Sequence, residues 1–200
     1  MLETLPTPSP PAPPARASAP SSSSSPSAAS CPDTTASRPE PPDRLRGLAP
    51  AGADTAGRRL LAGLLAGTAT PPPAARTLTL PPATLRRPGL ILCDTVFEEE
   101  LTLTPGVVFG GWIACLTDHF AGLVMLSALP DGSGFLTANL SVAYHAPLVP
   151  GPVAVETELT SCTTRRAVAE VRFTQAGALA SVGTVEQIVF RRSGRADARQ

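Results

Sequence analysis

The chain has 200 residues with 16 basic and 16 acidic side chains, so its formal net charge at neutral pH is zero, and every basic residue is arginine. With no basic stripe and only six Phe, one Tyr and one Trp, the composition argues against nucleic acid as a partner. The longest apolar stretch, 112–129, is interrupted by Asp118 and His119, so we expect no membrane span, which needs about 20 apolar residues.

The four cysteines stand far apart, at positions 31, 93, 115 and 162, with no pair at the spacing of a metal or redox site. They are typical of reduced, structural thiols. We therefore expect no metal site, no cofactor and a cytoplasmic location.

Residues 1–50 are rich in Pro, Ser and Ala and contain few large apolar side chains. Such a segment buries too little apolar surface to offset its conformational entropy, so we predict a disordered tail there and a disordered C-terminus over 193–200. An organelle transit segment is the alternative, because such segments are rich in Ser and Arg, but acidic residues and dense prolines favour a plain tail. A docking role for this tail is a separate hypothesis.

Residues 51–87 are predicted to form a short helix followed by an irregular connector. Four leucines between residues 60 and 65 recur at helical spacing, and Asp54 or Thr55 precedes them as a candidate N-cap. Prolines 71–73 stop this helix, and further prolines break the segment that follows.

Residues 88–192 are predicted to form one α+β domain. A first strand is expected over Leu90–Phe97 and a long helix over Gly110–Ala128, a length of about 28 Å. After the turn signal "PDGSG" an alternating strand runs from Phe135 to Tyr144, and three further strands complete the domain. This order predicts a single antiparallel sheet that buries one face on the long helix.

Three stretches together carry a resemblance to a known family. They are "GGWIACLTD", "GFLTANLSVAYHAPLVPG" and "TTRRAVAEVRFTQ", at family-like separations. This combination resembles the PaaI-like group of hotdog-fold acyl-CoA thioesterases, over about residues 88–190. The resemblance implies a long central helix wrapped by a curved antiparallel sheet. It also implies a homodimer or homotetramer with active sites between subunits.

In that family the start of the helix meets the thioester carbonyl and an acid farther along the helix acts on it. The resemblance therefore implies that the backbone N–H groups of Gly110 and Gly111 polarise the carbonyl. Unpaired N–H groups and the helix dipole favour negative charge there. Asp118 would be the base or nucleophile. It lies about 10 Å along the axis from Gly111, so the resemblance implies that the acid of one subunit faces the helix start of its partner.

Other candidate residues lie on the strand after the helix and in a turn between two later strands. Thr137 stands where the family has a Ser or Thr that holds the acid or the water, and strand alternation puts Asn139 on the same face. Arg165 and Arg166 lie in a turn, where they would either bind a nucleotide phosphate or form a solvated hairpin tip.

Each of the main candidates also has a structural explanation. Asp118 would be a buried acid paired to an arginine or a helix-surface residue, and Thr137 a simple strand residue. The two glycines at 110 and 111 would serve tight packing.

One departure from the family concerns Phe109, which stands where family members usually have His. Phenylalanine has no hydrogen-bonding group, so the polar group at the helix mouth is missing. The leading hypothesis is hydrolysis of acyl-CoA or acyl-carrier-protein thioesters, and the alternative is a non-catalytic hotdog subunit that binds acyl-CoA or another chain. A hydratase or dehydratase ranks last, because neither His119 nor His145 stands in the motif of such enzymes.

Overall fold

The computed structural model describes residues 43–192, which belong to a single unit of the chain. The disorder predicted for 1–42 and 193–200 falls outside the described residues. Residues 43–50 were assigned to the tail, but they contain the 3-10 helix η1 (Asp43–Leu45) and are tied to the domain by two backbone hydrogen bonds of 2.8 Å, Gly47 N to Cys162 O and Ala49 N to Ala128 O. Leu45 and Leu48 also pack against the core, so the ordered part of the chain begins before the predicted boundary at residue 50.

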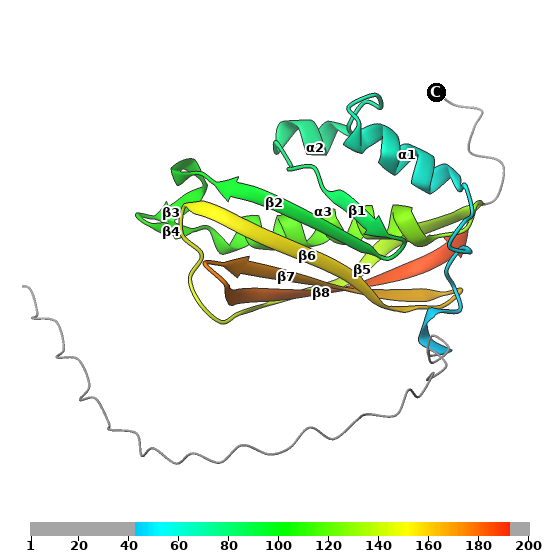
Figure 1. The fold of residues 1–200 in the computed structure, drawn as a ribbon. Coiled ribbons are helices and arrows are strands. Elements are labelled where there is room, and N and C mark those ends of the chain that lie inside the picture. The colour runs from blue at the N-terminus through cyan, green and yellow to red at the C-terminus, as the bar shows by residue number, and fades with distance from the viewer. Residues whose placement is uncertain (1–42, 193–200) are drawn as a thin grey trace, which may run out of the picture. The chain divides into compact units, whose positions relative to one another are not determined.

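The central helix α3 (Gly110–Ala128) has the bounds predicted for it. It lies along the sheet (Figure 1), and its buried residues form the middle of the apolar core. By length and composition α3 would suffice to cross a membrane, but 56% of its most apolar window is buried inside the domain. That burial is expected of the core helix of a hotdog fold. The residues that α3 buries are Ile113, Leu116, Thr117, Phe120, Ala121, Leu123, Val124, Met125, Ser127 and Ala128.

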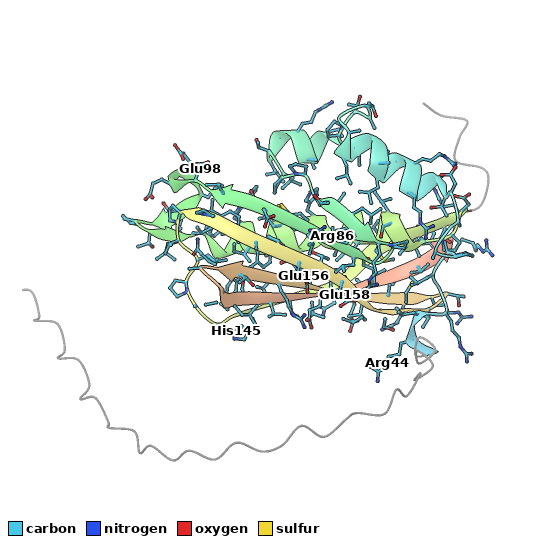
Figure 2. The ribbon with its side chains drawn as sticks, viewed as in Figure 1. Arg44, Arg86, Glu98, His145, Glu156 and Glu158 are labelled. Atoms are coloured by element: carbon cyan, nitrogen blue, oxygen red, sulfur yellow. The ribbon has the colours of Figure 1, made fainter. Side chains whose placement is uncertain are left out.

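One sheet of six strands has the order β1-β2-β6-β7-β8-β5, and every neighbouring pair is antiparallel. One face of the sheet packs on the core and the other faces outward, as strand β6 shows. Val153, Val155 and Leu159 are buried. Glu156 and Glu158 lie on the outer face (Figure 2). The strands are β1 (Thr84–Arg87), β2 (Leu90–Phe97), β5 (Ser133–Tyr144), β6 (Gly151–Cys162), β7 (Arg166–Gln175) and β8 (Ala178–Arg191).

The segment before α3 holds more structure than the sequence predicts. Helix α1 (Ala56–Leu65) is confirmed, with the Thr55 side chain accepting a hydrogen bond from Arg58 N. The predicted irregular connector instead forms α2 (Pro73–Thr77) and β1, because proline is tolerated in a first helical turn. Since β1 pairs with β2, the strand Leu90–Phe97 is the second of the sheet. The 3-10 helix η2 (Glu99–Leu101) and the strand pair β3 (Thr102–Thr104) and β4 (Val107–Val108) were not predicted.

Strand β5 contains a β-bulge that changes which side chains share a face. Its register with β8 shifts between Thr137 and Asn139, leaving Ala138 as the extra residue. Beyond the bulge Leu140 and Val142 pack on the core, so Asn139 points to the opposite face from Thr137. The prediction that these two residues share a face is therefore wrong, because strict alternation does not survive an inserted residue.

Candidate active site

The first turn of α3 presents unpaired backbone donors. Among residues 43–192, neither Gly110 nor Gly111 donates a backbone hydrogen bond, while Trp112 N already bonds to Phe109 O at 2.9 Å. The helix dipole adds partial positive charge at this end. The turn can therefore stabilise a negatively charged oxygen.

Aromatic side chains surround these two glycines. The Tyr144 hydroxyl donates to Gly110 O at 2.8 Å, and a Cβ on Gly111 would lie 2.4 Å from the Phe109 ring. Both glycines thus allow close packing, which was the structural explanation for them. Phe109 and Tyr144 line a cavity of about 630 Å³ together with His145, which lies at this end of the domain (Figure 2).

The helical acid is held by the residue predicted to hold it. Thr137 Oγ1 donates to Asp118 Oδ1 at 2.7 Å, joining α3 to β5. Asp118 is exposed in the single chain and forms no ion pair among residues 43–192, so it is not a buried acid paired to an arginine. The carboxylate needs no buried partner because it is exposed and accepts a hydrogen bond from Thr137 on the edge strand β5.

Asp118 lines a second cavity of about 670 Å³, bounded by α3 on one side and by α1, α2 and the residues after α2 on the other. Its lining includes Leu60, Leu64, Leu78, Cys115, Gly122 and Leu126. Neither Gly110 nor Gly111 borders this cavity. The carboxylate and the helix start therefore lie at different cavities of one chain, as their separation of about 10 Å along the helix requires.

Cys115 is the other candidate nucleophile beside Asp118. Burial, followed by the negative charge of Asp118, raises the pKa of the Cys115 thiol above its ordinary value. Burial likewise raises the pKa of Cys93 and of Cys162 to about 11. These thiols remain protonated near neutral pH, when a carboxylate is ionised.

The two histidines differ in their surroundings. His119 Nε2 lies 3.2 Å from Pro81 O, and burial lowers the pKa of His119 in spite of that hydrogen bond and the nearby Asp118 charge. His119 is thus satisfied within its own chain. His145 is exposed and borders the cavity at the helix start, a position that the sequence left undecided.

Arg165 and Arg166 lie far from the helix start within one chain. Arg166 pairs with Ile188 of β8, which pairs with Leu136 of β5, whereas Gly110 contacts Tyr144 at the other end of that strand. Eight strand residues correspond to about 26 Å. Within one chain, Arg165 and Arg166 therefore lie near the opposite end of the sheet from Gly110 and Gly111.

Two residues near the site were not found from the sequence. Tyr144 fixes the first turn of α3, and its place at the end of a strand gave no sign of that contact. Gln187 stands directly opposite Thr137 on β8, is 1% exposed, and its amide has no hydrogen-bond partner among residues 43–192. Nothing in the sequence distinguishes this glutamine from an ordinary strand residue.

A long helix packed on a six-stranded antiparallel sheet defines a hotdog-fold protein, as predicted. Solved structures share this fold, among them a phenylacetic acid degradation-related protein of Ralstonia eutropha (22% identity, 64% of this chain, 98% of that chain, TM-score 0.56). A thioesterase family protein of Silicibacter pomeroyi (16% identity, 68% and 98%, TM-score 0.57) and a thioesterase protein of Streptococcus pneumoniae solved with coenzyme A (23% identity, 56% and 87%, TM-score 0.50) are also similar.

The thioesterase superfamily model matches residues 105–182, which include the helix start, Asp118 and Thr137. The resemblance to the hotdog-fold thioesterases is therefore confirmed. No curated protein matches the chain in sequence.

Proposed function

We propose that the chain hydrolyses acyl thioesters, with Asp118 as the acid that acts on the carbonyl. The observation that carries the proposal is the 2.7 Å hydrogen bond from Thr137 to Asp118 within the segment that matches the thioesterase superfamily. A carboxylate that a hydrogen bond holds in one orientation is suited to serve as base or nucleophile.

In the proposed reaction the N–H groups of Gly110 and Gly111 donate hydrogen bonds to the thioester carbonyl oxygen as negative charge develops on it. Asp118 takes a proton from water while the water oxygen bonds to the carbonyl carbon. The tetrahedral intermediate then collapses, the carbon–sulfur bond breaks, and the departing thiolate receives the proton from Asp118. The products are a carboxylic acid and a free thiol. If Asp118 attacks the carbonyl instead, the carbon–sulfur bond breaks, the thiolate leaves and a mixed anhydride forms. Water then cleaves the anhydride to the free acid, which regenerates Asp118 and supplies the proton to the thiolate.

A second copy of the chain would bring the two halves of this site together. The support is the edge of β5, a 12-residue strand that, among residues 43–192, pairs with β8 alone and exposes Leu136 at 64%. An unpaired edge of this length is a template for another strand. We infer a homodimer, or a tetramer built from it, in which Asp118 of one protomer faces the helix start of its partner.

Coenzyme A is the carrier that we favour. Support comes from two similar proteins. The one from Streptococcus pneumoniae was solved with coenzyme A, and the one from Streptococcus mutans was solved bound to acetyl-CoA. Arg165 and Arg166 would meet the phosphates only from a neighbouring protomer, because they lie far from the helix start of their own chain. Acyl carrier protein is the alternative carrier, and a cytoplasmic location stays a prediction.

Phe109 favours a second candidate function. Its ring lies against Gly111, where the family has a hydrogen-bonding histidine, so the carbonyl would be held by backbone N–H groups alone. Loss of one oxyanion donor costs about 10² to 10³ in rate. A subunit that binds acyl-CoA without cleaving it is the corresponding alternative.

Thiol release from a panel of acyl-CoA and acyl-carrier-protein thioesters separates the two functions. A hydrolase releases thiol in proportion to enzyme, with saturation in thioester. Binding of the same thioesters by calorimetry, with no thiol released from any of them, would instead establish the binding subunit.

A further inference from the structure

We propose that the cavity of about 670 Å³ between α3 and the α1–α2 segment holds the acyl chain of the thioester, and that the α1–α2 segment sets the chain length accepted. This inference rests on the proposed function, because it needs the thioester carbonyl at Asp118. The volume lies within the range of about 300 to 1,000 Å³ that is usual for small-molecule sites.

One stripe of α3 forms the floor of this cavity. Cys115, Asp118, Gly122 and Leu126 follow one another at intervals of three or four residues, so they share a helix face. From the carboxylate to Leu126 this face extends about 12 Å along the axis. A group whose carbonyl lies at Asp118 would therefore place its tail along an apolar floor.

Gly122 leaves room in the middle of this floor. A Cβ at Gly122 would meet only Phe135, at 3.9 Å, which is an ordinary contact. Glycine lowers the stability of a helix interior relative to alanine, and packing within the chain does not require it here. Gly122 keeps the cavity open one helical turn beyond Asp118, which explains a glycine that packing within the chain does not require.

The opposite wall is apolar and faces the empty space. Leu60 is 47% exposed and Leu78 is 44% exposed, and both border the cavity, as do Leu64 and Leu80. Asp118 and His119 are the only ionisable side chains besides the Cys115 thiol in the lining. An alkyl chain is the kind of ligand that binds favourably here, because binding removes apolar surface of the chain and of the leucines from water.

The α1 part of this wall is bonded to the rest of the domain. The Arg58 guanidinium donates to Ser127 O at 2.8 Å and to Pro50 O at 2.9 Å, and Ala56 N donates to Asp131 Oδ1 at 2.7 Å. A Cβ on Gly57 would lie 2.5 Å from Leu126 O, so α1 approaches the backbone of α3 closely. A fixed wall discriminates between ligand lengths better than a mobile one.

Leu60 lies between this cavity and a second one, so its side chain limits how far the first cavity extends. A neighbouring cavity of about 600 Å³ shares Leu60, Leu126 and Phe135 with the first. Leu60 belongs to α1, which precedes the segment 105–182 matched by the thioesterase superfamily. The limit on chain length is therefore a property that this chain's own N-terminal helices add to the domain.

The test compares kcat/KM for butanoyl-CoA and dodecanoyl-CoA in the full-length chain and in two variants that fill the cavity, Gly122→Leu and Leu60→Trp. Val96→Trp is the matched control, because Val96 is 53% exposed on β2 and lines none of the three cavities described. We expect both cavity variants to lose about tenfold or more on dodecanoyl-CoA and to stay near wild type on butanoyl-CoA, since one methylene in an apolar pocket discriminates about 10- to 200-fold. Equal effects on both thioesters, or none, would overturn the proposal.

A binding measurement separates this inference from the proposed hydrolysis. Calorimetry with the Asp118→Asn variant should show tighter binding of dodecanoyl-CoA than of butanoyl-CoA, and Gly122→Leu added to that variant should remove the difference. This result would support the acyl cavity even if the wild type hydrolysed nothing. Equal affinities for the two thioesters would overturn it even if hydrolysis were established.

Discussion

Replacing Thr137 by valine keeps the shape of the side chain but removes the hydroxyl that donates to Asp118 at 2.7 Å. A net hydrogen bond is worth about 1 kcal/mol, and bonds to charged groups about 1.5 to 3 kcal/mol. Both groups are exposed in the single chain, so the lower figure applies, and about 1 kcal/mol corresponds to a roughly fivefold fall in kcat. Thr137→Ser keeps the donor and should stay within about twofold of wild type.

The assay is thiol release at saturating acyl-CoA, together with urea unfolding of each variant. If Thr137 positions Asp118, valine should lower kcat while changing the free energy of unfolding little. The loss should shrink in an Asp118→Asn background, because that variant has no catalytic carboxylate for Thr137 to position. The reasoning is refuted if valine leaves kcat unchanged, or if serine loses as much activity as valine.

Three further predictions concern stability, pH and the helix mouth. Gly183→Ala would place a Cβ 2.3 Å from Thr117 Cγ2 in the core, so we expect urea unfolding to show a loss of about 1 to 3 kcal/mol. Burial lowers the pKa of His119, so the unfolded chain binds a proton near pH 6.5 that the native chain does not. The free energy of unfolding should therefore fall as the pH drops below about 7, and the fall should be smaller for His119→Gln than for wild type. Phe109→His restores a hydrogen-bonding group beside Gly111 and should raise kcat for thiol release, whereas a lower kcat would show that the apolar ring is required.

Much of the domain could be predicted because its elements carry strong local signals. The bounds of α3 were predicted from Gly110 to Ala128, since an apolar helix between a glycine pair and a turn has clear ends. The strand Leu90–Phe97 was equally distinct, with β-branched and aromatic residues between prolines and acidic residues. The pairing of Thr137 with Asp118 followed from the resemblance and agrees with the contact in the structure.

The remainder depends on contacts between distant segments, which a single sequence does not display. Strand β1 is four residues long in a proline-rich stretch and is recognisable only through its pairing with β2. The bulge at Ala138 requires the register with β8, so alternation alone misplaced Asn139. Whether Asp118 was a buried acid paired to an arginine or a helix-surface residue could not be decided from the sequence, and the structure exposes it on the surface of α3.

The central claim is that Asp118 carries out thioester hydrolysis, and comparing Asp118→Asn with wild type tests it most directly. The amide has nearly the same shape but is neither a base nor a nucleophile at neutral pH. The account predicts that kcat for thiol release falls by at least about 10²-fold, while acyl-CoA binding and the unfolding transition stay unchanged. A variant that binds acyl-CoA, folds normally and still releases thiol at the wild-type rate would contradict it.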